Sequence, residues 1–316
     1  MRAPHLAGVG DFAAGTTLAV GAAVLFAAGS VLQHRALSSG GPERGIDLRA
    51  LARRPVWLAG QATTISGSLV QVAALALAPV SIVQPLLAGA LVIALGIRAV
   101  RDRCLPGGGE LLGALCTVGG LALFLSAARP ASGRADHLPA PVVVLSVVAG
   151  VGLLVALAAR TRGGPVSAVT CGVCGGIAAG CAAVLISAAF KAAGRAPHAV
   201  TSGLFWLLVA AAIAVAATAQ FGSQLAYSRG ALAWSLPALT VLDPLAAIPA
   251  ARLLLGERLE PGHAAIWTPA ALIAVAGVVL LARTGSSCRR PLIPRPGAAE
   301  SADVRAGERS ARDGQG

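Results

Sequence analysis

The stretch Trp234–Ala250 has the sequence WSLPALTVLDPLAAIPA, which places one aspartate and three prolines in an otherwise apolar segment. The apolar residues on both sides of Asp243 predict a buried helix. A charged group inside such a helix is costly in a membrane, and proline removes a backbone hydrogen bond from a helix interior. The stretch therefore raises the question of which function requires these residues.

Composition assigns the chain to the membrane proteins. Of its 316 residues, 56% are hydrophobic and 12% are charged, whereas a soluble domain has about 25% charged residues. A spanning helix needs about 20 mostly apolar residues. On that basis we predict an all-α integral membrane protein with about nine transmembrane helices, over residues 13–33, 56–78, 80–98, 110–128, 139–160, 167–190, 203–222, 231–254 and 264–282.

The net charge of +12 is distributed unevenly over this topology. Most of the 25 lysines and arginines fall on one side, and positive residues gather in cytoplasmic loops. We therefore expect a multi-pass protein of the cell membrane with its N-terminus outside and its C-terminus in the cytoplasm. The absence of aromatic-basic clusters from the sequence argues against nucleic acid. The expected partners are the lipid bilayer and a small-molecule or ion substrate, and a homodimer is left open.

The two ends of the chain differ from the rest. Residues 1–12 predict a short tail before the first span rather than a signal peptide, because the apolar run that follows is too long. Residues 284–316 are rich in Arg, Pro, Gly, Ser and acids, which predicts a disordered cytoplasmic tail.

The two halves of the sequence resemble each other. Ala22–Ala36 (AAVLFAAGSVLQHRA) matches Ala182–Ala196 (AAVLISAAFKAAGRA), and Ala74–Pro85 has the same length as Ala226–Pro237, each running from Ala to Pro. The first four spans then correspond to the last four, which run in the opposite direction across the membrane. We predict an inverted structural repeat of two four-helix units, at 13–138 and 167–283, joined by a linker helix at 139–160.

Asp243 is the clearest candidate for a functional residue, because it lies midway along the eighth predicted span. The neighbouring prolines predict kinks or local breaks, and the freed carbonyls can bind a cation or a polar solute. We expect a substrate or ion site near the membrane midplane. Its expected side chains are Asp243, Thr240, Ser235, Gln84, Ser81, Gln71 and Gln224, and its expected helix breaks are Pro85, Pro237 and Pro244.

A structural role is the alternative for each of these residues. Asp243 could pair with Arg229 or Arg252, or cap freed amides. Single amides and hydroxyls in spans often serve only as interhelical contacts. The sequence contains no paired acid and base groups, nucleophile elbow or phosphate loop, so we expect neither an enzyme nor a cofactor, and the ligands of any transported metal are left open.

The Cys171–Cys174 pair has a spacing that occurs in redox and metal sites. Gly172, Gly176 and Gly180 overlap it at intervals of four residues. This is the small-residue pattern of a close contact between membrane helices, which we expect here.

Three segments carry a resemblance to a known family: LQHRAL at 32–37, WLAGQATTISGSLVQVAALALAPVSIVQPLLAG at 57–89 and LLLGERL at 253–259. They resemble the drug/metabolite transporter superfamily, in particular its branch of NIPA-type magnesium transporters. The likeness covers residues 13–283 and implies the fold of that superfamily. The magnesium-transporting members have a Gly-Glu pair where this chain has Gly67-Ser68, and a lysine pair where it has Gln33-His34. These departures weaken the assignment to magnesium.

The sequence thus predicts a secondary transporter that moves a small solute or metabolite across the cytoplasmic membrane by alternating access. The alternatives are a divalent-cation, magnesium-like transporter and a non-transporting membrane scaffold or accessory subunit. Water access separates a transporter from a scaffold. Cysteines at 84, 237 and 243 would react with polar thiol reagents from one side at a time only if a cavity alternates.

Overall fold

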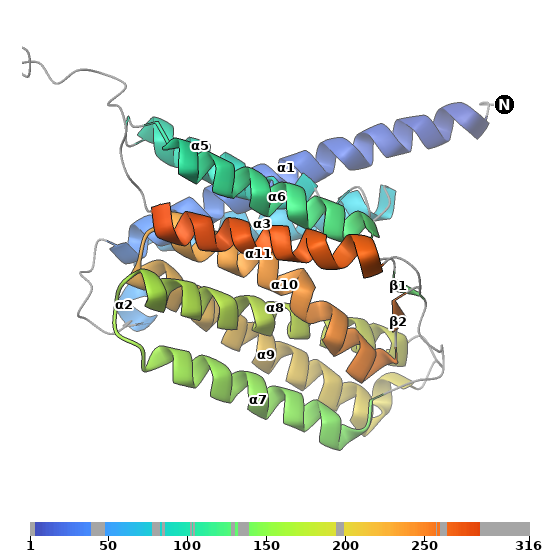
Figure 1. The fold of residues 1–316 in the computed structure, drawn as a ribbon. Helices are drawn as coiled ribbons and strands as arrows, with labels where there is room; N and C mark the ends of the chain where they lie inside the picture. The colour runs from blue at the N-terminus through green and yellow to red at the C-terminus, as the bar shows by residue number, and fades with distance from the viewer. Residues whose placement is uncertain are drawn as a thin grey trace, which may run out of the picture.

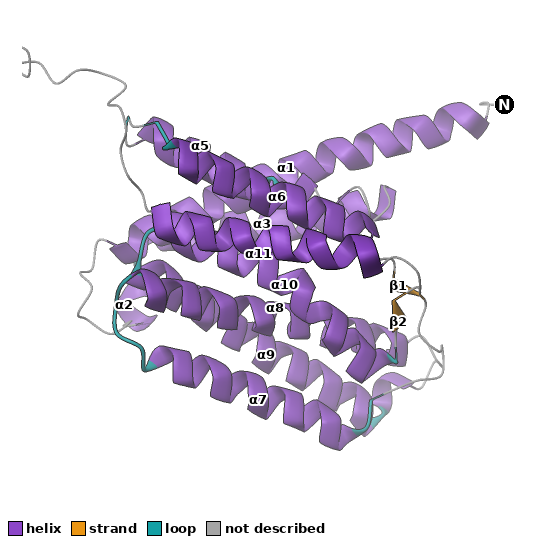
Figure 2. Cartoon of the chain, in the orientation of Figure 1, coloured by secondary structure: helices purple, strands orange, loops and turns teal. Residues whose placement is uncertain are grey.

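The computed structural model describes residues 4–38, 48–77, 83, 86–101, 103, 105–127, 130–131, 139–193, 199–256, 258–259 and 264–284. This part of the chain is almost entirely helical (Figure 1 and Figure 2). Its elements are, in chain order, α1 (Pro4–Ser38), α2 (Leu48–Ala52), α3 (Pro55–Leu77), α5 (Ala90–Arg101), α6 (Gly108–Ala127), β1 (Pro130–Ala131), α7 (Pro141–Ala159), α8 (Pro165–Ala193), η1 (Ala199–Thr201), α9 (Gly203–Arg229), α10 (Leu232–Leu255), β2 (Arg258–Leu259) and α11 (Ala264–Thr284).

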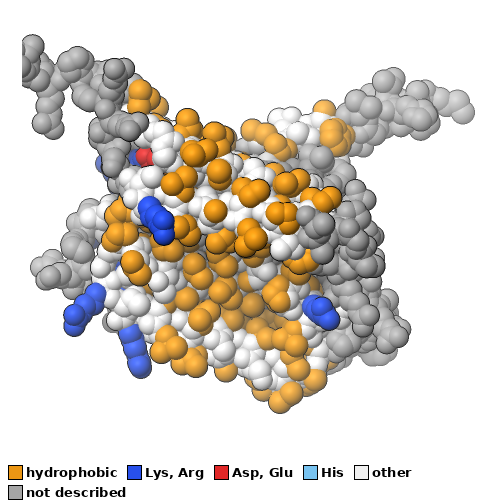
Figure 3. Space-filling view, viewed as in Figure 1, with side chains coloured by type: hydrophobic (Ala, Val, Ile, Leu, Met, Phe, Trp, Pro, Cys, Tyr) orange, Lys and Arg blue, Asp and Glu red, His pale blue; other side chains and the backbone are white. Residues whose placement is uncertain are grey.

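Seven helices in the described part of the chain are long and apolar enough to cross a membrane. The spans are Phe12–Ser38, Gly108–Ala127, Pro141–Ala159, Pro165–Ala193, Gly203–Arg229, Leu232–Leu255 and Ile266–Thr284. Hydrophobic side chains cover the visible face of the molecule, and the Lys and Arg side chains lie toward its two ends (Figure 3). This is the architecture of a multi-pass membrane protein, as the composition predicted.

The two remaining predicted spans differ from these seven. The helix α3 covers the span predicted at 56–78, but its six hydroxyl and amide side chains between Gln61 and Gln71 make it more polar than the others. In place of the span at 80–98, the structure has α5 with 12 residues, about 18 Å of helix. Residues 78–82 and 84–85, which would begin that span, lie outside the described part.

The N-terminal end of the helical region also departs from expectation. The helix α1 begins at Pro4, within the residues expected to form a tail, and its N-terminal part extends beyond the other helices (Figure 1). The predicted tail from residue 285 onward lies outside the described residues.

A short strand pair, β1 with β2, joins the segments that follow α6 and α10, with Pro130 opposite Leu259. The sequence offered no signal for this pairing.

The helices of the bundle pack mainly in pairs. The helix α1 packs along α3, and α8 packs along α9. In the same way α5 packs against α1, and α10 packs against α8, while α6 and α11 pack along each other. The helix α7, expected as a linker, packs against α8 and α9. Among the candidate spans α8 is the most buried, so it forms the centre of the second half.

Glycine allows the closest of these contacts. A Cβ atom added to Gly176 would lie 2.8 Å from the carbonyl oxygen of Leu239 on α10. A Cβ added to Gly180 would overlap the carbonyl oxygen of Asp243. Gly172 lies on the same face of α8 and touches the preceding turn of α10. The predicted small-residue contact is therefore confirmed, and it brings the two backbones together without intervening side chains.

Candidate functional site

The helix α10 carries Asp243 and runs without interruption from Leu232 to Leu255. Pro237, Pro244 and Pro249 all lie inside it. The expected breaks at Pro237 and Pro244 are therefore wrong. A helix keeps its backbone hydrogen bonds within the segment, which a membrane interior strongly favours, and one proline removes only one such bond.

Asp243 is half-buried, with its backbone against Gly176 and Gly180 of α8. Across the described residues, no hydrogen bond or ion pair to its carboxylate is found. The two arginines considered as partners are placed elsewhere. Arg229 binds the C-terminal end of α7, and Arg252 is exposed in the last turn of α10. Asp243 is thus an acid in the middle of a candidate span without a partner in the described part of the chain.

Two hydroxyls accompany Asp243 on α10, and both bond to their own helix. The Thr240 hydroxyl donates to the carbonyl oxygen of Leu236 at 2.9 Å, and the Ser235 hydroxyl to that of Ala231 at 3.5 Å. Their oxygen lone pairs can still accept a hydrogen bond. In addition, Pro244 has no N–H to offer the carbonyl oxygen of Thr240 four residues earlier. Thr240 and Asp243 together therefore supply carboxylate, hydroxyl and carbonyl oxygens within about one helical turn.

The structure does not place the other predicted site residues on helices α3 and α9 in a common site with each other, and it leaves the rest undescribed. Ser81, Gln84 and Pro85 lie outside the described residues. Gln71 is half-buried on α3, and no hydrogen bond joins it to Gln224. Gln224 is buried on α9 in a network of its own. The structure thus brings together Asp243 and Thr240, whereas it separates Gln224 from Gln71.

The network around Gln224 joins three helices. Its amide nitrogen Nε2 donates to Oε1 of Gln33 on α1 at 2.7 Å. Its Oε1 accepts a hydrogen bond from Nε1 of Trp57 on α3 at 3.0 Å. The Nε2 of Gln33 in turn lies 3.1 Å from Oε1 of Gln61 and 2.9 Å from Oγ1 of Thr64, both on α3. We define the amide network as these five residues.

Further contacts surround the amide network. The Tyr227 hydroxyl lies 3.4 Å from the Ser30 hydroxyl, and Nε2 of His34 lies 3.0 Å from the carbonyl oxygen of Gly230. One turn from Gln224 on α9, the amide nitrogen of Gln220 is buried and has no hydrogen-bond partner in the described part of the chain. Polar groups therefore line the contact between α1 and α9 over successive turns.

Sequence reasoning missed Gln33 and Trp57 as partners of Gln224. Gln33 entered the sequence argument only as a departure from the transporters that the chain resembles. Trp57 entered it only as the first residue of a segment that carries this resemblance. The available signal was the occurrence of long amides in three apolar helices, at 33, 61 and 224. Such amides need partners inside a membrane, but the sequence does not say which ones meet.

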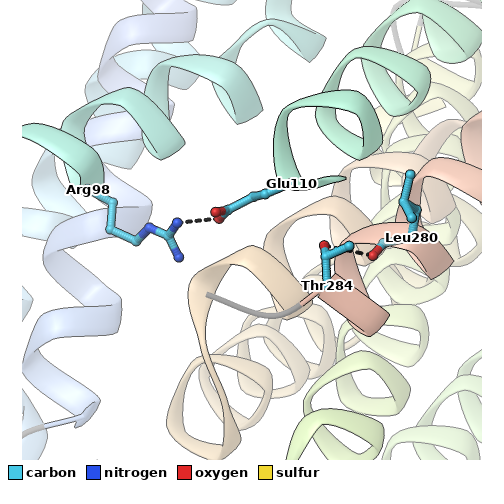
Figure 4. A network of polar contacts seen from close by, with 4 residues as sticks. All are labelled: Arg98, Glu110, Leu280 and Thr284. Atoms are coloured by element: carbon cyan, nitrogen blue, oxygen red, sulfur yellow. Dashed lines mark hydrogen bonds and ion pairs between the residues drawn. The ribbon is translucent and has the colours of Figure 1, made fainter. Parts of the chain in front are cut away.

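A second acid was also missed. Glu110 lies in the first turn of α6, at a helix end that the sequence did not single out, and only 2% of its side chain is exposed. It accepts a hydrogen bond from Nη2 of Arg98 on α5 (Figure 4). The other carboxylate oxygen, Oε2, and Nη1 of Arg98 are buried without a partner among the described residues. This ion pair links α5 to α6 beside the C-terminal end of α11, where Thr284 contacts Gly109.

Arg229, at the end of α9, has a structural role at the contact with α7. Its Nη1 donates to the carbonyl oxygen of Ala158 at 2.8 Å and to the Thr161 hydroxyl at 2.9 Å, and its Nη2 donates to the carbonyl oxygen of Ala159 at 2.6 Å. These carbonyls belong to the last turn of α7, where helical partners are lacking. Arg229 therefore satisfies the C-terminal end of α7 and holds it against α9.

Replacing Arg229 with alanine is expected to lower the free energy of unfolding by about 2 kcal/mol, because hydrogen bonds from a charged donor are lost. A lysine at position 229 would restore only part of the lost free energy of unfolding, since it lacks the planar fork of donors that arginine has. Trypsin cleavage at Arg160 and Arg162, which are exposed in the adjacent loop, measures the local effect. Faster cleavage is expected in Arg229→Ala, whereas unchanged rates would show that the contacts are dispensable.

The Cys171–Cys174 pair lies in the first half of α8. Cys171 and Cys174 are buried and free on α8, among apolar side chains of α7 and α9. The sulfur of Cys171 also accepts a hydrogen bond from Nη1 of Arg229 at 3.3 Å. No group of three or more His, Cys, Asp or Glu side chains gathers in the part of the chain that the structure describes. Cys174 therefore packs as a small apolar residue, whereas Cys171 also contacts the guanidinium that holds α7 against α9.

Comparisons of this chain with protein-family models, with curated proteins and with solved structures give no match.

Proposed function

We propose that this chain is a secondary transporter of the drug/metabolite type, which moves a small solute across the cytoplasmic membrane by alternating access. The observation that carries the proposal is Asp243, a half-buried carboxylate midway along a membrane-spanning helix without a partner in the described part of the chain. An acid in that position is costly and usually marks the path of a substrate, an ion or a proton.

The surroundings of Asp243 supply oxygen ligands for such a substrate. Besides the carboxylate, Thr240 offers its hydroxyl and a carbonyl that Pro244 leaves without its usual partner. A protonated amine, a proton or a hydrated cation would each interact favourably with this set. We propose that a cationic group of the solute, or a coupled proton, binds at Asp243.

The arrangement of the helices supports two moving units. The helix α1 packs along α3 and touches α5, and α8 packs along both α9 and α10. Transporters built from two repeats place their substrate sites near the membrane midplane and move one unit against the other. The resemblance of residues 32–37, 57–89 and 253–259 to the drug/metabolite transporters is in keeping with an inverted repeat.

Flux into proteoliposomes tests the proposal. Labelled divalent cations, and then a pool of amino acids and metabolites, are offered with and without an imposed pH gradient. We expect saturable solute uptake that Asp243→Asn lowers by at least roughly tenfold. Thr218→Val serves as the control, because this hydroxyl bonds only to its own helix on α9. The control is expected to keep wild-type uptake.

The pattern of loss identifies what Asp243 binds. If it carries the coupled proton, Asp243→Asn loses gradient-driven uptake but still exchanges external for internal solute. If it binds the solute itself, both activities disappear. Cation flux lost in the variant would instead identify a divalent-cation carrier, and the absence of any flux from folded wild-type protein would support a scaffold.

A further inference from the structure

The amide network connects the two halves of the protein. Gln33 belongs to α1, and Trp57, Gln61 and Thr64 belong to α3, whereas Gln224 belongs to α9. The hydrogen bonds from Gln224 to Gln33 and from Trp57 to Gln224, at 2.7 Å and 3.0 Å, are the links that cross between the halves. Those from Gln33 to Gln61 and Thr64 stay within the first half.

The network lies toward one end of the bundle. Gln33 is near the C-terminal end of α1, Gln224 is near the C-terminal end of α9, and Trp57 is in the first turn of α3. The distribution of arginines predicts that this end faces the cytoplasm. Asp243, by contrast, lies midway along α10.

The chemistry of the network makes it responsive to water. Gln33 and Gln224 are buried at 3% and 2% exposure, and each amide oxygen and nitrogen that links the halves has its partner inside the network. Separating them in an apolar environment would leave donors and acceptors unpaired, which is strongly unfavourable. The halves can therefore part at this end only when water or a polar solute enters and takes over the hydrogen bonds.

We propose that Gln33, Gln224 and Trp57 form the cytoplasmic gate of this transporter, which is closed in the present structure. This inference rests on the proposed function and adds to it the residues that close one side. Gln220, one turn deeper on α9, has a buried amide nitrogen without a partner in the described chain. When the gate opens, water or solute reaches Gln220 from the cytoplasmic side.

Reversible cross-linking tests whether this contact must open. In a chain whose six cysteines are replaced by serine or alanine, Gln33→Cys and Gln224→Cys are joined by a short bis-methanethiosulfonate reagent. We expect uptake to fall to the level of empty liposomes and to return after reduction. The matched control joins Phe26→Cys to Gly67→Cys, a contact of α1 with α3 that lies within the first half and outside the amide network, and it is expected to keep its uptake. Equal uptake in both cross-linked proteins would overturn the proposal.

Thiol accessibility tests the gate without measuring flux. A cysteine at Gln220 is exposed to a membrane-impermeant maleimide from either side of vesicles, with Gln224 intact or replaced by leucine. We expect Gln224→Leu to raise labelling from the cytoplasmic side severalfold. A cysteine at Ile213, which is 65% exposed on the outer surface of α9, should remain unlabelled in the bilayer in both backgrounds.

The two measurements separate the gate from the transport activity. If no flux is found but Gln224→Leu opens access to position 220, the gate stands and the proposed substrate classes fail. If flux is found while position 220 stays unreactive in both backgrounds, the transporter stands and the network is only an interhelical contact. Labelling from the opposite side alone would place the gate at the other face and overturn its assignment to the cytoplasm.

Discussion

Replacing Glu110 with alanine is expected to lower the free energy of unfolding by about 3 kcal/mol. The substitution leaves the guanidinium of Arg98, which is 13% exposed, as an uncompensated charge between α5 and α6. Removing one partner of a buried ion pair typically costs about 3 to 5 kcal/mol, and the residual exposure of Arg98 favours the lower value. Unfolding in mixed micelles with increasing SDS, followed by circular dichroism, measures the change.

A double-mutant cycle shows whether the pair itself is responsible. One carboxylate oxygen of Glu110 and one nitrogen of Arg98 are buried without partners among the described residues, so the ion pair is incompletely satisfied. Replacing both residues, as Arg98→Met with Glu110→Leu, removes both charges and is expected to recover most of the lost stability. If the double variant is as unstable as the sum of the single ones, the destabilisation does not arise from an unpaired charge.

Replacing Gly180 with leucine is expected to lower the free energy of unfolding by at least about 3 kcal/mol. Even the first side-chain carbon would overlap the carbonyl oxygen of Asp243, which is backbone and cannot rotate away. The helices α8 and α10 would have to separate, and Asp243 would move with α10. The same SDS titration measures the stability, and uptake measures the displacement of Asp243.

The matched control is Gly150→Leu on α7. A Cβ atom at Gly150 has no atom within 4 Å, so the leucine side chain can point into the lipid. Its stability is expected to stay within about 0.5 kcal/mol of the wild type, as for most surface substitutions. Leucine favours a helix more than glycine does, so helix propensity cannot explain a loss in either variant. Similar losses in both variants would mean that the contact with α10 is not responsible.

Much of the architecture could be predicted from the sequence, because the length of an apolar segment can be read directly along the chain. Seven of the predicted spans correspond to helices able to cross a membrane. The spacing of Gly172, Gly176 and Gly180 also predicted a close contact correctly, since residues four apart lie on one face of a helix. The length of the span predicted at 80–98 stays a prediction, because the described part holds α5 with 12 residues and the start of the span lies outside it.

The candidate site was only partly accessible to sequence reasoning. Asp243 stands out from its neighbours because a single charge in an apolar segment needs no tertiary information to be noticed. The sequence could not show that the helix continues through Pro237 and Pro244, because whether a helix breaks at a proline depends on what packs against it. Glu110 was overlooked for a similar reason: its burial depends on α5, which supplies Arg98.

The sequence by itself determined that the chain is a helical multi-pass membrane protein with one acid in the middle of an apolar segment. These properties come from composition and from the spacing of residues along single helices, which neighbours in space do not alter. Only the tertiary structure decided that Gln33, Trp57 and Gln224 meet, and that Arg229 binds the end of α7 instead of Asp243. Such pairings join residues far apart in the chain, and many alternative pairs of similar polarity are compatible with the same sequence pattern.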